Sequence, residues 1–251
     1  MTEHVYDESF YNYLDSGSRS SARQVSSLIL AEIPIKSLLD VGSGHGAWAT
    51  EWLSAGVPDV LAVDGEYVSP SQLLVPRSSF HAHDLLVPLF LPRRFDLVQS
   101  LEVAEHLPAD KAAQFVDSLV RHGDIVLFSA AVPYQGGEHH VNEQPPEYWR
   151  QLFFERGYEV FDWLRPLLAH NSQVKRWYRF NSFLYANKEG QDRLTAPILK
   201  SRVPSERPLR VDGDLLWFAR RVLVRLIPSR LVKPVAIAKA KMEVWTKSVG
   251  R

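Results

Sequence analysis

The segment that most constrains the fold runs from an apolar stretch into a glycine-rich loop and reads LLDVGSGHG, at residues 38–46. Its glycines, Gly42, Gly44 and Gly46, carry no Cβ atom, so the backbone can turn tightly after a strand and approach a ligand closely. A helical pattern follows directly at residues 47–55. Strand, glycine loop and helix in this order predict an α/β fold that binds its ligand at the carboxyl end of the first strand.

Strand-like and helix-like segments continue to alternate along the chain. Apolar runs typical of strands lie at residues 35–41, 59–63, 79–82, 95–99, 124–131, 158–163 and 180–186. Stretches typical of helices lie at residues 47–55, 110–121 and 145–156. Alternation at this spacing predicts a doubly wound, Rossmann-like sheet, mainly parallel, with helices on both faces.

The pattern divides the chain into an N-terminal helical cap, a central α/β domain and a C-terminal extension, at residues 1–34, 35–188 and 189–251. A serine-rich stretch at residues 16–21 is expected to break the cap into two helices. Residues 188–210 are polar and rich in proline, which is typical of a linker. Two basic amphipathic helices are expected after it, at residues 215–227 and 235–247.

The extension differs from the rest of the chain in charge. The chain has 29 Lys and Arg and 29 Asp and Glu; residues 190–251 hold 14 of the basic and 5 of the acidic residues, a net +9 against −9 for the remainder. A neutral total is untypical of a nucleic-acid-binding protein. We expect the extension to dock on the acidic body or on a second subunit of a homodimer, because either contact neutralises both charges. Peripheral contact with an anionic membrane, or with an acidic polymer such as RNA, is the alternative.

The composition also bears on the compartment. The chain has no cysteine, which excludes disulfides and thiolate metal sites. Its first residues lack the basic and apolar regions of a signal peptide, and no apolar run is long enough to cross a bilayer. We therefore expect a cytoplasmic protein.

Three acids stand where successive predicted strands end: Asp40, Asp64 and Asp84. Asp40 would repel a pyrophosphate, and Gly46 comes one residue early for a dinucleotide-binding G-x-G-x-x-G loop. No Gly-Lys-Ser/Thr follows, which excludes a P-loop. Asp40 instead suits the ammonium group of a methionine moiety, Asp64 can accept both ribose hydroxyls, and Asp84 can accept from an adenine amino group.

The glycine loop and these acids together resemble the class I S-adenosylmethionine-dependent methyltransferases, over residues 36–187. The resemblance implies a seven-stranded sheet with its last strand antiparallel, and S-adenosylmethionine as the cofactor. The implied cofactor contacts are Asp40, Gly42, Gly44, Gly46, Asp64, Asp84, Leu85 and Leu101.

A group of potential metal ligands follows the fourth and fifth predicted strands. Glu102, Glu105 and His106 come after the fourth strand, and His140 lies in the loop after the fifth. In the family's strand order these strands are neighbours, so the two loops should face each other. Carboxylates and imidazoles converging there can hold Mg²⁺ or Mn²⁺, with Zn²⁺ as a further option. Without a metal, Glu105 would cap a helix and His106 would pack.

The Glu-x-x-Glu-His pattern is similar to that of ubiquinone-pathway catechol O-methyltransferases and small-RNA 3′-end methyltransferases. The segment that begins at His140 is similar to one in bacterial sugar O-methyltransferases, among which the methylmannose polysaccharide 1-O-methyltransferases are a further, more general likeness. The resemblance implies methyl transfer to a hydroxyl of a sugar or oligosaccharide, assisted by a divalent metal that lowers the pKa of that hydroxyl. His140 or His139 would take the proton, and Glu102 joins them as a catalytic candidate. One alternative is an O-methyltransferase that acts on a catechol, a polyphenol or another natural product. The other is a cofactor-binding regulatory or scaffold protein without catalysis.

Overall fold

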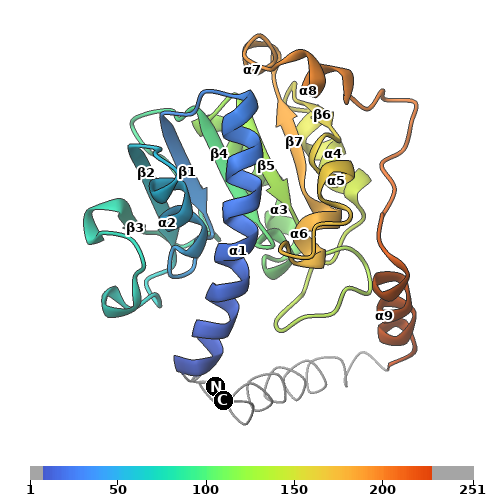
Figure 1. Ribbon diagram of the computed structural model, residues 1–251, viewed down its shortest axis with the longest axis horizontal. Helices are drawn as coiled ribbons and strands as arrows, with labels where there is room; N and C mark the ends of the chain where they lie inside the picture. The colour runs from blue at the N-terminus through green and yellow to red at the C-terminus, as the bar shows by residue number, and fades with distance from the viewer. Residues whose placement is uncertain (1–7, 228–251) are drawn as a thin grey trace.

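A seven-stranded sheet in the order β3-β2-β1-β4-β5-β7-β6 forms the centre of the computed structural model, which describes residues 8–227 and, of their side chains, those from residue 17 onward (Figure 1). The strands are β1 (Ser37–Val41), β2 (Asp59–Asp64), β3 (Phe80–Ala82), β4 (Leu97–Leu101), β5 (Ile125–Ser129), β6 (Glu159–Phe161) and β7 (Phe183–Ala186). Strands β1 to β5 pair in parallel, whereas β7 pairs antiparallel with both β5 and β6. The Rossmann-like methyltransferase sheet predicted from the sequence is thus confirmed.

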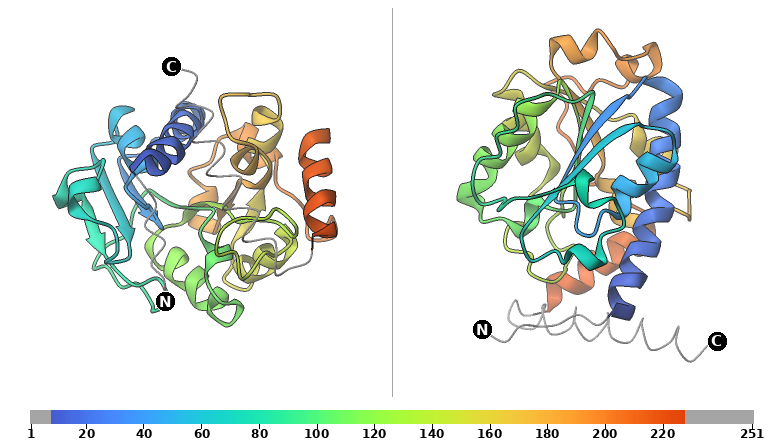
Figure 2. Two further views of the ribbon diagram at one scale, coloured as in Figure 1. Left: turned by 90° about the horizontal axis from the view of Figure 1, so that it is seen from below. Right: turned by 90° about the vertical axis from the view of Figure 1, so that its left-hand side faces the viewer.

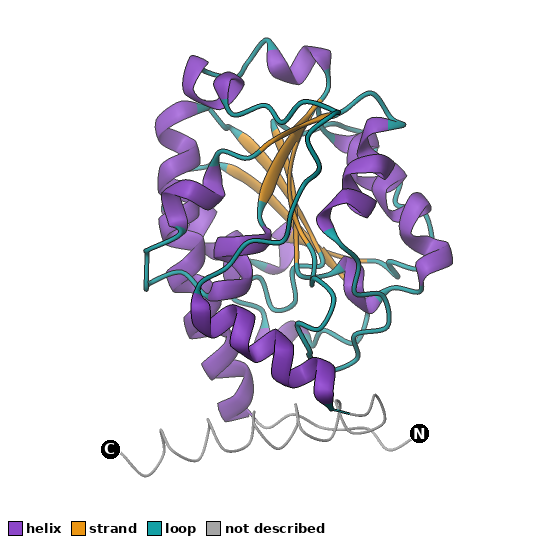
Figure 3. Ribbon diagram, turned by 90° about the vertical axis from the view of Figure 1, so that its right-hand side faces the viewer, coloured by secondary structure: helices purple, strands orange, loops and turns teal. Residues whose placement is uncertain are grey.

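Helices cover both faces of this sheet, as Figure 3 shows. The helices that the structure describes are α1 (Glu8–Glu32), α2 (Ala47–Ser54), α3 (Ala112–His122), α4 (Pro146–Phe154), α5 (Leu164–Leu168), α6 (Arg176–Asn181), α7 (Lys188–Gln191), α8 (Ala196–Lys200) and α9 (Leu215–Leu226). Side chains of α1, α2 and α5 share one buried cluster with one face of the sheet, and those of α3 and α4 share a second cluster with the other face. Every residue of β4 and β5 is buried, because a parallel strand between two helix layers meets apolar neighbours on both sides.

The predicted break in the N-terminal helix is wrong, because α1 runs without interruption through residues 16–21. The Ser21 hydroxyl donates back to the carbonyl of Gly17 (2.8 Å) and accepts from the backbone N–H of Lys175 (3.0 Å). Ala22 and Val25 are buried in the cluster that α1 shares with α2. Packing and these hydrogen bonds outweigh the weak helix propensity of serine.

Two further segments differ in detail from the expectation. The predicted strand at residues 180–186 begins as the end of α6, and β7 starts only at Phe183. Within the predicted linker at 188–210 lie the short helices α7 and α8. Arg150 of α4 donates to the carbonyls of Pro204 and Arg207 (both 2.7 Å), so this segment packs on the sheet domain.

The predicted helix at residues 215–227 is confirmed as α9, whereas the one predicted at residues 235–247 lies outside the described part of the chain. Arg220 donates to the carbonyls of Gln135 and Gly136 (both 3.0 Å), and Arg221 donates to that of Pro133 (3.0 Å). Figure 2 shows α9 against this loop, which follows β5. Within residues 8–227, no helix is both long and apolar enough to span a bilayer.

Candidate functional site

The glycine loop has the backbone conformation that its sequence predicts. Gly42, Gly44 and Gly46 have φ angles of +82°, +55° and +87°, a left-handed region that side chains with a Cβ atom disfavour. A Cβ on Gly42 would also lie 2.3 Å from a methyl group of Val103. The N–H of Gly42 donates to the carbonyl of Val63 in β2 (2.8 Å). The loop is therefore fixed to the sheet, and position 42 admits only glycine without local rearrangement.

Asp40, the carboxylate before this loop, is buried with one oxygen unpaired. Its Oδ1 accepts from Nε2 of Gln99 (2.9 Å), and Oε1 of Gln99 accepts from the indole N–H of Trp52 (2.9 Å). Its Oδ2 has no hydrogen-bond partner. Burial raises the pKa of Asp40 to about 7 because a low-dielectric surrounding disfavours the charged form. A cationic ligand beside Oδ2 would stabilise the carboxylate.

Asp64, at the end of β2, is buried and fully hydrogen-bonded. Its Oδ2 accepts from the N–H of Gly44 (2.6 Å), and its Oδ1 accepts from the N–H of Gly65 (2.7 Å) and from the hydroxyl of Tyr67. The Tyr67 side chain is 80% exposed, so a ligand hydroxyl can replace its phenol without disturbing the core. Asp64 thus links the glycine loop to the next strand end.

The remaining predicted cofactor contacts lie at the same edge of the sheet. Leu101 is buried at the end of β4. Asp84 lies two residues beyond β3 and is exposed, with Oδ1 accepting from the N–H of Leu86 (2.9 Å). Leu85 is half-buried and packs against the cluster shared by α3 and α4. Asp84 therefore stabilises a turn and differs from the two buried acids in being open to solvent.

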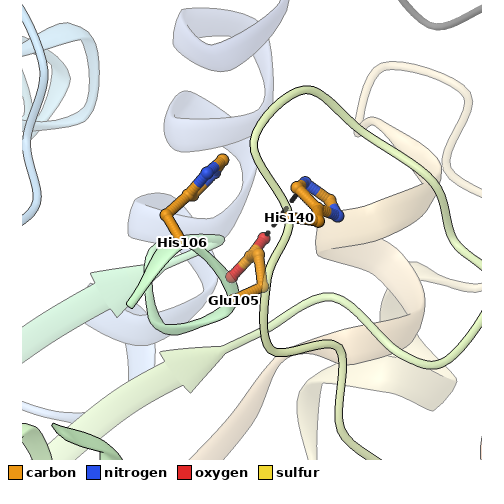
Figure 4. A group of neighbouring side chains, drawn as sticks. All are labelled: Glu105, His106 and His140. Atoms are coloured by element: carbon orange, nitrogen blue, oxygen red, sulfur yellow. Dashed lines mark ion pairs between the residues drawn. The ribbon is translucent and has the colours of Figure 1, made fainter. Parts of the chain in front are cut away.

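Three of the four predicted metal ligands come together across two loops. Glu105 and His106 lie on the short 3₁₀ turn after β4, and His140 lies on the loop after β5 (Figure 4). One potential ligand atom from each residue lies within 4.8 Å of the others. The carbonyl of Glu105 accepts from the backbone N–H groups of Val141 (2.9 Å) and Asn142 (3.0 Å), which joins the two loops.

The carboxyl group of Glu105 is fully buried, and neither of its oxygens has a hydrogen-bond partner. The nearest basic group is Nε2 of His140, 3.9 Å from Oε1. Burial, together with the nearby Glu102, raises the pKa of Glu105 well above its usual range. A buried polar group without a partner costs about 1–3 kcal/mol, and a bound cation would remove that cost.

The two imidazoles of this group are held in different ways. Burial of its ring and the nearby His140 lower the pKa of His106 to about 4, so this imidazole is neutral near pH 7. The two rings meet edge to face, with centroids 5.0 Å apart. Nδ1 of His140 lies 2.8 Å from Oε1 of Glu143. A proton on Nδ1 directed at this carboxylate leaves the Nε2 lone pair of His140 facing Glu105.

Glu143 was not predicted as a site residue, although it stands three positions after His140. Its Oε1 also accepts from the N–H of Gly136 (2.8 Å), and its Oε2 accepts from the N–H of Tyr134 (2.8 Å). One carboxylate thus fixes both the loop and the imidazole. The His-Val-Asn-Glu spacing is the only signal of this role in the sequence.

Glu102, the fourth predicted ligand, points into a separate amide network. Its Oε2 accepts from Nε2 of Gln135 (2.6 Å) and its Oε1 accepts from Nδ2 of Asn181 (3.2 Å). Its backbone is left-handed, with φ of +57°, and burial raises the pKa of its carboxyl group. His139 also has a φ of +57°, and its side chain is exposed. The buried Gln135 and Asn181 were not predicted as site residues.

Comparison with known proteins supports the fold assignment. No protein-family model matches the sequence. Over 98 residues the chain is 36% identical to the chloroplastic tocopherol O-methyltransferase of Arabidopsis thaliana, a match that covers 36% of this chain and 28% of that protein. The chain thus spans less than a third of this relative.

Several solved structures resemble this chain over more than two thirds of its length. The sugar N-methyltransferase KedS8 from Streptoalloteichus sp. ATCC 53650 matches with a TM-score of 0.53 and 16% identity, over 69% of this chain and 87% of that one. CalS10, an amino pentose methyltransferase from Micromonospora echinaspora, matches with a TM-score of 0.52 and 17% identity, over 75% of this chain and 100% of that one. The methyltransferase domain of bacterial CtHen1-C matches with a TM-score of 0.51 and 14% identity, over 68% and 98%. The chain has the fold of these methyltransferases.

Proposed function

We propose that this protein is an S-adenosylmethionine-dependent methyltransferase that acts on a hydroxyl group of a sugar or oligosaccharide. The glycine loop supports the cofactor assignment. Its glycines have no side chains, so a ligand can reach the backbone between two buried acids, Asp40 and Asp64. The unpaired Oδ2 of Asp40 suits a ligand ammonium group. The buried Asp64 suits the ribose hydroxyls, with its bond to the exposed Tyr67 hydroxyl as the one to exchange.

The cofactor would supply an electrophilic methyl group on a sulfonium. The main task of the chain is then to hold donor and acceptor in line and to remove the acceptor proton. Gly42, Gly44 and Gly46 would line the methionine end of the cofactor. Asp84, Leu85 and Leu101 would lie toward the adenine, at the ends of the neighbouring strands.

Activation of the acceptor is assigned to Glu105, His106 and His140. The observation that carries this assignment is the buried, unpaired carboxyl group of Glu105 facing Nε2 of His140. One carboxyl group and two imidazoles suit a divalent cation, Mg²⁺ or Mn²⁺, which would lower the pKa of a bound hydroxyl. Glu143 would orient His140 for this purpose, and His139 on the same loop is the second candidate base. Glu102 would stay with its amide partners beside the cluster.

Transfer of a labelled methyl group from S-adenosylmethionine tests this function. Glycosides and oligosaccharides would be compared with catechols and with amino sugars, each with added Mg²⁺ and with excess chelator. We expect transfer to glycosides that chelator abolishes and Mg²⁺ restores. Turnover that is indifferent to chelator would remove the metal from the mechanism, and transfer only to amino sugars would contradict O-methylation.

Matched variants locate the chemistry. Glu105→Gln should abolish the Mg²⁺ dependence together with most of the turnover. Glu159→Gln removes an acid of similar size that forms a surface ion pair with Arg202, and it should leave turnover unchanged. Equal effects of the two variants would place the active site elsewhere.

A phenolic acceptor is the second candidate, because the partial relative from Arabidopsis thaliana is a tocopherol O-methyltransferase. The acceptor panel separates the two, since catechols would then outcompete glycosides. Cofactor binding without transfer to any acceptor would instead favour a regulatory or scaffold role.

A further inference from the structure

Helix α9 exposes an almost wholly apolar face to solvent. Its exposed side chains at residues 215, 222 and 226 recur at helical spacing and share one side of the helix. The large ones are Leu215 (84% exposed), Leu216 (64%), Phe218 (41%), Val222 (59%), Leu223 (63%) and Leu226 (75%). A surface helix normally turns such a face toward the protein core, so α9 is oriented the opposite way.

This orientation is fixed by contacts on the other side of α9. Trp217 is buried against Phe180, and Arg220 and Arg221 donate to the carbonyls of the loop after β5. Asp214 caps the helix by accepting from the N–H of Trp217 (2.8 Å) and pairs with Arg176 (2.8 Å). The side of α9 opposite the apolar face is therefore already packed on the protein, and the apolar face points away from the core.

Charge indicates what covers this face. Residues 215–251 contain nine Lys and Arg and one Glu, a net charge of +8. A second copy of α9 would bring the same positive charge against it, which opposes pairing. An anionic lipid surface offers both an apolar layer for the leucines and negative headgroups for the cations.

We propose that α9 is an interfacial helix that binds the surface of an anionic membrane. It lies in the plane of the interface, with its apolar face toward the acyl chains. Because α9 is bonded to the loop that carries His140, binding brings the candidate site next to the lipid surface. This surface function stands independently of the proposed methyl transfer.

Vesicle sedimentation of the full chain tests the proposal. We expect the protein to sediment with vesicles that contain phosphatidylglycerol, and to stay in solution with pure phosphatidylcholine or at high salt. The double variant Leu223→Ser/Leu226→Ser should bind the anionic vesicles at least about tenfold more weakly, because each leucine contributes buried apolar area.

The control variant is Val87→Ser/Phe90→Ser, which removes two exposed apolar side chains between β3 and β4. It should bind the vesicles as the unchanged protein does. Equal loss in both double variants, or no vesicle binding by the unchanged protein, would overturn the proposal. So would a dimer in light scattering that the α9 variant dissociates, because the face would then be an interface between copies.

Discussion

The two halves of the candidate site lie at neighbouring strand ends and differ in how the protein hydrogen-bonds their buried acids. On the β1–β2 side, Asp64 is satisfied by the protein itself, through the N–H groups of Gly44 and Gly65 and the hydroxyl of Tyr67. On the β4–β5 side, both oxygens of Glu105 are buried without a hydrogen-bond partner. In the first half Oδ2 of Asp40 is the one oxygen of the two acids without a partner, whereas in the second half both oxygens of Glu105 lack one. The first half is therefore the more preorganised of the two.

The difference indicates which kind of ligand each half is suited to bind. A preorganised loop loses little conformational entropy when its ligand arrives, which favours tight binding of a cofactor. An unsatisfied buried carboxyl group stores a free-energy cost that a cation or a bound hydroxyl removes. We therefore assign the β1–β2 side to cofactor binding and the β4–β5 side to acceptor chemistry, and the following predictions test this division.

The largest effect is expected at Gly42. Gly42→Ala combines a positive φ with a Cβ 2.3 Å from Val103, so it should abolish cofactor binding and cost at least about 3 kcal/mol of unfolding free energy. Gly56→Ala is the matched control, because its φ is also positive but nothing lies within 4 Å of its Cβ. It should cost about 1–2 kcal/mol and leave the affinity unchanged. Urea unfolding and calorimetric titration measure both quantities.

Glu105→Gln should lower Mg²⁺-dependent turnover by about a hundredfold, as expected for loss of a charged ligand. Cofactor affinity should stay within about twofold, because Glu105 belongs to the other half. Steady-state kinetics and cofactor titration of the same preparation check this. A parallel loss of cofactor affinity would mean that the two halves do not work separately.

Asp64→Asn should weaken cofactor binding by about ten- to a hundredfold, since hydrogen bonds to a charged acceptor contribute about 1.5–3 kcal/mol. Asp84→Asn should change it by less than about threefold, because an exposed carboxylate gains less from each bond. Titration with S-adenosylhomocysteine compares the two variants. If Asp84→Asn had the larger effect, the ribose would lie nearer β3 than we propose.

Glu143→Gln should lower turnover by about tenfold, because the amide holds His140 less firmly than the carboxylate does. Glu143→Gln should also shift the dependence of turnover on pH. A purely structural role of Glu143 would not produce this shift. Cofactor affinity serves as the control and should be unchanged. An unaltered profile would remove Glu143 as the positioning residue for His140.

The last prediction concerns the pH dependence of stability. The pKa of Asp40 is raised from 3.8 to about 7 in the folded chain, so Asp40 keeps its proton in this range while the unfolded chain loses it. Stability should therefore fall as pH rises from about 4 to about 7, by at most about 1.4 kcal/mol per pH unit from this group. Asp40→Asn should remove this contribution. Urea unfolding at several pH values measures the free energy of unfolding of both proteins. The same dependence on pH in the unchanged protein and in Asp40→Asn would contradict the assigned pKa.

The sequence predicted the features that depend on local chemistry. The glycine loop was recognisable because positive φ angles require glycine. That Glu105 and His140 would meet was predicted because they follow neighbouring strands; their binding of a metal stays a prediction. The prediction of a helix break at residues 16–21 was wrong. Serines of α1 form hydrogen bonds with residues 173–175, which are far away in the sequence. The amphipathic pattern predicted α9, but it could not show which face would turn outward.

The hydrogen-bond partners of the site residues could not be predicted from the sequence either, because they too depend on contacts between distant segments. Gln135 and Asn181 meet Glu102 only because the loop after β5 folds back over α6. Glu143 reaches His140 only because Tyr134 and Gly136 direct their N–H groups toward it. Such contacts between loops leave no periodic or compositional trace.

The central claim is that the loop between β1 and α2 binds S-adenosylmethionine. Equilibrium dialysis of the full chain against the labelled cofactor tests it most directly, without requiring an acceptor or a metal. We expect saturable binding of one molecule per chain, which S-adenosylhomocysteine displaces and which Gly42→Ala abolishes. No saturable binding to the folded protein, or undiminished binding by Gly42→Ala, would contradict it.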